Sequence, residues 1–210
     1  MVRAAPGGQQ TMTASRDNMV RSFIAIPVPR TGLEVLEKVV KRLDSEMGGK
    51  VRWVRPRGIH LTLKFMGDIP ASTLEQVLET LPQVTASFGP FEISMSGLGV
   101  FPNPRRPRVL WAGMAGDLET LSALQLAVDE AVGRLGLPKE DRPFSPHLTL
   151  GRVRRDTNEE QSRTIGYLMS NTELQAVPPW SVDAVNLMRT ELDPTGSRHY
   201  LVGSATIGGG

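Results

Sequence analysis

The stretch "IHLTLKFMG", residues 59–67, has the composition of a buried β-strand, yet it contains His60, one of three histidines in the chain. A second stretch, "SPHLTLGRV" at residues 145–153, repeats His-Leu-Thr-Leu letter for letter. On a strand the histidine and threonine of each motif share one face and the two leucines share the other. The leucines can then enter a core, and the sequence predicts that the two polar pairs face each other across one groove.

The elements that precede the two motifs also repeat. Residues 21–29 predict an apolar strand, and the amphipathic helix after it ends at Gly48 and Gly49. Residues 106–114 predict another apolar strand, followed by an amphipathic helix over 117–136. Because strand, helix and His-Leu-Thr-Leu strand occur twice in this order, the sequence predicts an internal duplication of one α+β unit.

A helix follows each motif as well. The first is expected over about 72–81, where Ser72 and Glu75 have the spacing of a capping box, and the second near 159–170. Further strands are expected at 91–101 and in the two segments "WSVDAVNLMRT" and "HYLVGSA".

The ends of the chain differ from this regular middle. Residues 1–18 are rich in Gly, Pro, Gln, Ser and Thr without periodicity, which predicts a flexible tail. We expect a single domain over 19–205 and a second flexible end over 206–210.

Composition excludes several classes of protein. A chain of 210 residues can bury a sizeable core, and its net charge of +2 demands no anionic partner. It has no cysteine, which excludes disulfide scaffolds, thiol nucleophiles and Cys-ligated zinc. There is no His-x-x-x-His pair for zinc, no apolar run that could span a membrane and no secretory signal, so we expect a cytoplasmic protein without metal.

Two matched histidines and threonines suit one chemistry. Hydrolysis of a cyclic phosphodiester by in-line attack needs a base for the water and an acid for the departing oxygen, on opposite sides of phosphorus. His60 and His147 can fill these roles, because an ordinary histidine pKa of about 6.5 permits either protonation state near neutrality. The hydroxyls of Thr62 and Thr149 can donate to phosphate oxygens, and Arg152 can clamp the phosphate with two hydrogen bonds. No cofactor is needed for such a site.

Other residues are weaker candidates for substrate binding. Phe65 and Phe144 flank the motifs, and each can either line a nucleotide site or pack in the core. Trp53 and Tyr200 can stack on a base or serve as core residues. His199 has no motif around it and is expected to be exposed or at a strand edge.

Arginines cluster in two places. Arg105, Arg106 and Arg108 lie in "NPRRPR", and Arg154 and Arg155 follow the second motif. They can meet an RNA backbone, and a solvated basic loop is the alternative.

With these motifs, the chain resembles the two-histidine (2H) phosphoesterases, and within them the RNA 2′,3′-cyclic phosphodiesterases formerly called 2′-5′ RNA ligases. The resemblance covers about residues 19–203 and is carried by "RSFIAIPVP", "VRWVRPRGIHLTLKFMGDI", "GLGVFPNPRRPRVLWAGM", "RPFSPHLTLGRVRR" and "VNLMRTELDPTGSRHYLVG". It implies an α+β, bilobal fold: two pseudo-symmetric antiparallel-sheet lobes, helices outside, and a central cleft with one His-x-Thr motif per lobe.

The resemblance also implies an activity and roles. The expected reaction is hydrolysis of a terminal RNA 2′,3′-cyclic phosphate to a 2′-phosphomonoester. His60 would be the general acid for the leaving 3′ oxygen and His147 the general base for water. Thr62 and Thr149 would hold phosphate oxygens, and Arg152 matches a family arginine beside the phosphate.

Two other functions stay open from the sequence. The same histidines can join a 2′,3′-cyclic end to a 5′-hydroxyl, which makes the chain a 2′-5′ RNA ligase. A module that binds RNA ends without catalysis is the other alternative, although a pure binder needs no matched acid and base. The expected partners are RNA ends or nucleotides with a 2′,3′-cyclic phosphate, and the expected state is a monomer.

Overall fold

The computed structural model of the chain describes residues 18–193 and 196–208, in which strands and helices follow each other as the sequence predicts. The helices are α1 (Arg30–Met47), α2 (Ala71–Thr85), α3 (Leu118–Arg134), α4 (Glu159–Asn171) and the 3-10 turn η1 (Pro56–Gly58). The strands are β1 (Met19–Pro27), β2 (Val51–Trp53), β3 (His60–Pro70), β4 (Phe91–Phe101), β5 (Val109–Gly116), β6 (His147–Val153), β7 (Trp180–Val182), β8 (Ala184–Asp193) and β9 (Gly196–Thr206).

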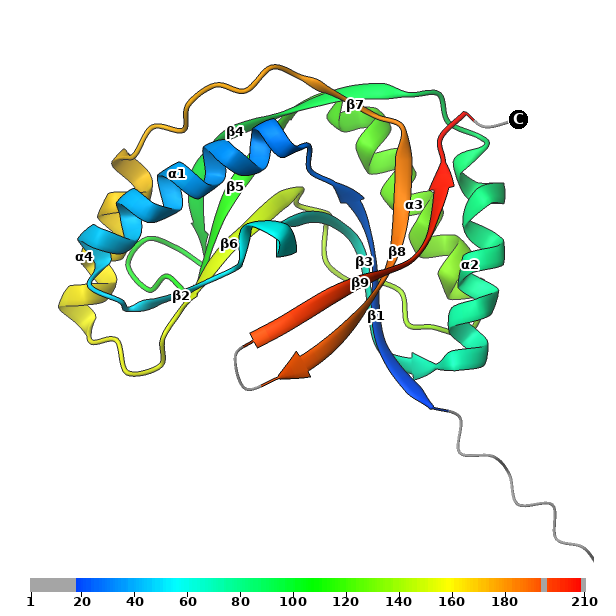
Figure 1. Cartoon of the computed structure of the whole chain (residues 1–210), viewed down its shortest axis with the longest axis horizontal. Coiled ribbons are helices and arrows are strands. Elements are labelled where there is room, and N and C mark those ends of the chain that lie inside the picture. Colours follow the sequence, from blue (N-terminus) through cyan, green and yellow to red (C-terminus); the bar gives the residue numbers. More distant parts are fainter. Residues whose placement is uncertain (1–17, 194–195, 209–210) are drawn as a thin grey trace, which may run out of the picture.

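The strands form one curled, antiparallel sheet with the order β7-β4-β5-β6-β3-β1-β8-β9, and β2 pairs with β6 (Figure 1). The two motif strands, β3 and β6, lie at its centre and pair through Leu61 and Leu148. We call β3-β1-β8-β9 the His60 lobe and β7-β4-β5-β6 with β2 the His147 lobe. This arrangement confirms the predicted bilobal α+β fold.

The helices lie on the outer face of the sheet and interlock the lobes (Figure 1). Helices α2 and α3 pack on the His60 lobe, and α1 and α4 pack on the His147 lobe. The helix α1 follows β1 of the His60 lobe, and α3 follows β5 of the His147 lobe, so each crosses to the other side. The two repeats of strand, helix, motif strand and helix are therefore arranged with pseudo-two-fold symmetry.

The motif leucines fill the core, as the alternation predicts. Leu61, Leu63, Leu148 and Leu150 are at most 3% exposed. Burial of such side chains is worth about 1.5–3 kcal/mol each, so it fixes which face of β3 and β6 points inward. The histidine and the threonine of each motif therefore point to the concave face.

Lys64, directly after the first motif, is a buried cation with two partners. Its Nζ donates to Asp129 Oδ1 of α3 at 2.5 Å and to the Pro138 carbonyl at 2.5 Å. The Asp129 carboxylate also accepts from the Glu140 backbone N–H. The pair ties β3 to α3 and to the loop after it.

One local expectation, a capping box at the start of the second helix, differs from the structure. Helix α2 begins at Ala71 with Pro70 at its N-cap and has no side-chain cap hydrogen bond, so the predicted capping box of Ser72 and Glu75 is wrong. Pro70 ends β3 with a φ of −57° that already suits entry into a helix. The capping box occurs instead at α4, where Asn158 and Gln161 bond each other's backbone.

The boundaries of the folded chain also shift. Ile207 is buried, and its N–H donates to the Asp183 carbonyl, so the packed chain extends past the predicted limit of residue 205. Of the predicted N-terminal tail, only Asn18 is among the described residues, and its carbonyl accepts from the Ala71 N–H. Among the described helices, none combines the length and apolar character needed to cross a bilayer.

Candidate active site

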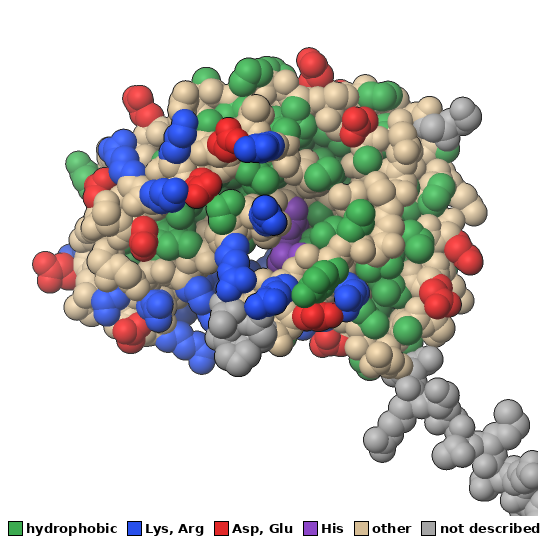
Figure 2. Space-filling model, in the orientation of Figure 1, with side chains coloured by type: hydrophobic (Ala, Val, Ile, Leu, Met, Phe, Trp, Pro, Cys, Tyr) green, Lys and Arg blue, Asp and Glu red, His purple; other side chains and the backbone are tan. Residues whose placement is uncertain are grey.

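The strand register puts both polar pairs on the concave face of the sheet. Because β3 and β6 are antiparallel and pair at Leu61 and Leu148, His60 lies at the level of Thr149 and Thr62 at that of His147. All four polar side chains are half-buried. Figure 2 shows histidine side chains inside a hollow of this face, with Lys and Arg side chains around it.

A β-bulge follows the threonine in each motif. In β3, Thr62 pairs with Ala25 and Lys64 with Ile24, which leaves Leu63 as the extra residue. In β6, Thr149 pairs with Trp111 and Gly151 with Leu110, which leaves Leu150. A bulge interrupts the alternation of faces, so a residue five positions after the histidine returns to the histidine's face.

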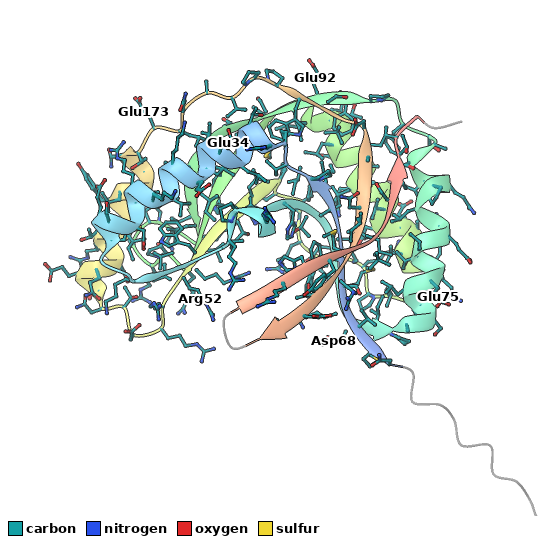
Figure 3. The ribbon with its side chains drawn as sticks, viewed as in Figure 1. Glu34, Arg52, Asp68, Glu75, Glu92 and Glu173 are labelled. Carbon is teal, nitrogen blue, oxygen red and sulfur yellow. The ribbon has the colours of Figure 1, made fainter. Side chains whose placement is uncertain are left out.

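The bulges decide where Phe65 and Arg152 lie. Phe65 pairs with Phe23, and Arg152 pairs with Val109, and both pairs share the face of the motif threonines. Arg152 also pairs with Arg52 of β2, which Figure 3 shows on the concave side of the sheet. Phe65 and Arg152 are therefore equivalent positions of the two lobes, one aromatic and one cationic, and the structure brings both to the histidines' face.

His60 lies in an aromatic enclosure. Its ring stacks on Phe23 with centroids 4.3 Å apart, and the ring of His199 stands edge-on to it at 5.2 Å. Burial, and secondarily the like charge of His199, lower the pKa of His60 from 6.5 to about 4, while a hydrogen bond to the Gly58 backbone raises it in part. In the free protein His60 is accordingly neutral at pH 7.

His147 has other neighbours than His60, but it too bonds the backbone two residues before it. Its Nδ1 lies 2.7 Å from the Ser145 carbonyl, and because a carbonyl only accepts, Nδ1 carries the hydrogen in the neutral ring. Its Nε2 is then available as a base. The Phe101 ring meets the imidazole edge-on at 5.1 Å. Each motif histidine thus contacts the backbone two residues before it.

Phe101 and Trp111 form an aromatic platform next to His147 that sequence reasoning missed. The Trp111 indole lies so close to Gly99 that a Cβ there would be 2.3 Å from the ring, and a Cβ on Gly113 would be 3.3 Å away. Trp111 shares its face with Thr149, its pairing partner. Gly99 on the neighbouring strand β4 and Gly113, two residues after Trp111 on β5, are the signal that could have identified the platform.

For three predicted binding residues the structure shows contacts other than with the motif histidines. Trp53 pairs with Gly151 on the outer face, and its Nε1 donates to Asp44 Oδ1 at 2.7 Å. Tyr200 packs under the guanidinium of Arg189, its partner on β8. Phe144 packs against the main core. Trp53 and Phe144 thus pack against the core, which was the alternative to a role in binding. Tyr200 follows His199 on the strand, so its side chain points to the opposite face.

The clustered arginines are all exposed. Arg105 and Arg106 lie in a turn whose backbone N–H groups donate to Asn103 Oδ1, and Arg154 donates its backbone N–H to the Lys50 carbonyl. Arg108 and Arg155 are exposed beside them. Contact with an RNA backbone stays a prediction for this group.

The third histidine, which no motif surrounds, lies beside His60. His199 is on β9, which is an edge strand as predicted, but its ring faces inward to His60. The two histidines line a cavity of about 130 Å³ together with Arg57, Asn186 and Met188. A tetrapeptide motif could not reveal His199, because only the pairing of β8 with β9 brings it to the site.

Known proteins share this organisation. A family model described as LigT-like phosphoesterase matches residues 26–111 and 115–199, so that each match contains one motif histidine. The RNA 2′,3′-cyclic phosphodiesterase of Methanothermobacter thermautotrophicus is 34% identical over 180 residues, covering 84% of this chain and 93% of that protein. The protein of the same name from Archaeoglobus fulgidus is 39% identical over 140 residues, covering 67% and 76%.

Solved structures agree in fold. A crystal structure from Thermus thermophilus has a TM-score of 0.69 at 26% identity, covering 90% of this chain and 98% of that one. Escherichia coli LigT complexed with 3′-AMP has a TM-score of 0.68 at 20% identity with the same coverage, a likeness of fold alone. Since the family model matches both repeats and the fold agrees throughout, the chain belongs to the LigT-like phosphoesterase family.

Proposed function

We propose that the chain hydrolyses terminal RNA 2′,3′-cyclic phosphates to 2′-phosphomonoesters. The observation that carries this proposal is the meeting of two His-x-Thr motifs on one concave face, each histidine held by the backbone two residues earlier. The names of the relatives from Methanothermobacter thermautotrophicus and Archaeoglobus fulgidus support the same substrate.

The proposed reaction places the cyclic phosphate between the histidines. His147 takes a proton from water through Nε2 as the oxygen attacks phosphorus, and the bond from phosphorus to the ribose 3′ oxygen breaks. His60 gives its proton to that oxygen. The products are a 2′-phosphate and a free 3′-hydroxyl, and the two histidines have exchanged protonation states, which solvent restores.

The acid role of His60 requires help from the substrate. A pKa of about 4 leaves the free imidazole without the proton that an acid must donate. The negative phosphate, placed against the ring, favours the imidazolium and so couples proton uptake to binding. An acid and a base that act together should give a bell-shaped pH profile of the rate, whose two apparent pKa values belong to the pair of histidines.

The remaining groups hold the phosphate and the nucleoside. The hydroxyls of Thr62 and Thr149 donate to non-bridging oxygens, where charge develops in the transition state. Arg152 supplies a cation on the same face. Phe65, 51% exposed, offers an aromatic surface for a base, with the Arg21 guanidinium over its ring at 4.9 Å.

Product analysis tests the proposal. An RNA ending in a 2′,3′-cyclic phosphate is incubated with the protein in EDTA, and the end group is identified. A 2′-phosphate end that disappears with both His60→Ala and His147→Ala supports the proposal. A strict requirement for added metal ion would overturn the mechanism.

The same assay separates the alternatives. Adding an RNA with a 5′-hydroxyl reports ligation, for which water at roughly 55 M is a strong competitor. Tight binding of the cyclic end without turnover would assign a non-catalytic RNA-end module. Hydrolysis of small cyclic nucleotides at the same rate would show that the strand beyond the end contributes nothing.

A further inference from the structure

We propose that His199 is a positioning residue of the same site, which holds the ring of His60 against Phe23 and closes the cavity beside it. The inference rests on the proposed function, because it assigns His199 to the reaction that His60 serves. Neither histidine motif contains His199. It lies on β9, the edge strand of the His60 lobe, and the pairing of that strand brings it to His60.

Three rings form a compact cluster. The imidazole of His60 is nearly parallel to Phe23, with an interplanar angle of 20°. The imidazole of His199 is perpendicular to both, at 88° to His60 and 86° to Phe23, with centroids 5.2 and 5.0 Å away. Edge-to-face contacts of this kind are favourable for aromatic rings and leave His60 little freedom to rotate.

His199 is itself anchored. The hydroxyl of Thr190, its pairing partner on β8, lies 3.0 Å from Nδ1. A Cβ added to Gly58 would be 3.6 Å from His199 Cδ2, so the ring packs along the glycine whose backbone bonds His60. Loss of the His199 ring would therefore loosen both contacts that orient His60.

The cavity between the rings has one sign of charge. Its lining includes two basic groups, Arg57 from η1 and His199 from β9, and no lining residue is a carboxylate. The lining residues from β1, β8 and α1 are uncharged, namely Ala25, Pro27, Asn186, Met188 and Leu33. Among these lining residues, Arg57 and His199 are thus the titratable groups that face His60. The like charge of His199 disfavours a proton on His60, and a phosphate anion would screen that repulsion.

The test follows the titration of His60 in full-length protein. The imidazole Cε1–H signals are assigned by NMR with His60→Gln and recorded from pH 3.5 to 8 in wild type, His199→Ala, His199→Phe and Thr206→Ala. With His199→Ala, water and a lost like charge should raise the pKa of His60 by about one unit. Thr206→Ala, exposed on the same strand, should leave it unchanged.

Kinetics supply the second readout. We expect His199→Ala to lower kcat about tenfold with little change in KM, because a misplaced acid affects the chemical step. His199→Phe keeps the edge-on packing and should recover most of kcat. If His199→Ala leaves the His60 titration unmoved, the proposal is wrong even where activity falls. Because the titration needs no substrate, it decides about His199 even if the chain does not hydrolyse cyclic phosphates.

Discussion

The two lobes carry the same motif in different surroundings. Both contain His-Leu-Thr-Leu, a bulge at the second leucine and a backbone contact to the histidine from two residues earlier. Yet His60 is enclosed by Phe23 and His199, whereas the ring of His147 meets Phe101 edge-on at 5.1 Å and the more distant Trp111 at 6.5 Å. Duplication supplies two matched histidines, and the neighbours of His60 lower its pKa to about 4, so the proposed acid gains its proton only with the bound phosphate.

The positions after the motif also diverge. At the fourth residue after the histidine, the His60 lobe has the buried cation Lys64 and the His147 lobe has Gly151. A Cβ on Gly151 would lie 2.6 Å from the Val51 side chain and 2.9 Å from the Trp53 ring, so only glycine fits there. At the fifth residue the lobes present Phe65 and Arg152. The equivalent position is therefore aromatic in one lobe and cationic in the other.

The largest expected effect comes from removing either histidine. His60→Ala and His147→Ala should each lower kcat by about 10²–10⁴-fold, the usual contribution of a general acid or base. The kcat of the double variant should be only slightly lower than that of the less active single variant, because the two groups act in one step. Single-turnover hydrolysis of a 2′,3′-cyclic RNA end measures this. Multiplicative losses in the double variant would mean that the lobes act independently.

Breaking the buried ion pair should destabilise the His60 lobe. Lys64→Met leaves the Asp129 carboxylate buried without its cation, and we expect a loss of about 3–5 kcal/mol in the free energy of unfolding. The double variant Lys64→Met/Asp129→Leu should recover much of the loss. Urea denaturation measures both.

The exposed pair of Lys41 and Glu37 on α1 is the matched control for this pair. Its Nζ–Oε1 distance is 2.9 Å, and Lys41→Met should cost no more than about 0.5 kcal/mol. Equal losses at the two pairs would contradict the assigned role of burial.

Stability should depend on pH through His60. Its pKa of about 4 in the folded protein lies below the ordinary histidine value of 6.5, so the unfolded chain binds a proton first as pH falls. The contribution of His60 to the free energy of unfolding is fully present above pH 6.5, is lost between pH 6.5 and 4, and changes no further below pH 4. It amounts to about 3 kcal/mol in total. Denaturation at pH 7 and 4.5 measures this loss, and the free energy of unfolding should change less between the two pH values in His60→Gln than in wild type.

The charged position of the His147 lobe should matter more than its aromatic counterpart. Arg152→Met should reduce kcat/KM about 10–100-fold, because charge-assisted hydrogen bonds to phosphate are worth about 1.5–3 kcal/mol. Phe65→Ala should raise KM only about fivefold through lost stacking, because Phe65 is half exposed and the loss should lie at the lower end of the about 1–3 kcal/mol that stacking on a base is worth. Arg163→Met on α4, where the arginine pairs with Glu159, is the control. An equal loss in Arg163→Met would show that net charge alone is responsible.

Periodicity predicted the elements and faces well. The leucines of both motifs are buried, and the helices begin and end within a few residues of the predicted bounds. Repetition of a four-residue motif also predicted the duplication that the two family matches confirm. These features depend on local patterns, which the sequence displays directly.

Features that depend on strand pairing were harder to predict. Trp53 was an expected binding residue, but its register against Gly151 turns it to the outer face. Tyr200 was preferred over its neighbour His199, although the pairing of β9 with β8 and its bulge at Leu187 and Met188 brings His199 inward. Strict alternation would also have put Phe65 on the wrong face. Register and bulges are long-range properties that a single sequence does not display.

The most direct test of unequal roles is an RNA end whose 3′ oxygen of the cyclic phosphate is replaced by sulfur. A thiolate leaves without protonation, so the substrate needs a base but no acid. We predict that His60→Ala hydrolyses it within about tenfold of wild type, whereas His147→Ala remains impaired by about 10²-fold or more. Rescue of His147→Ala instead would reverse the roles, and rescue of neither variant would contradict acid–base pairing across the two lobes.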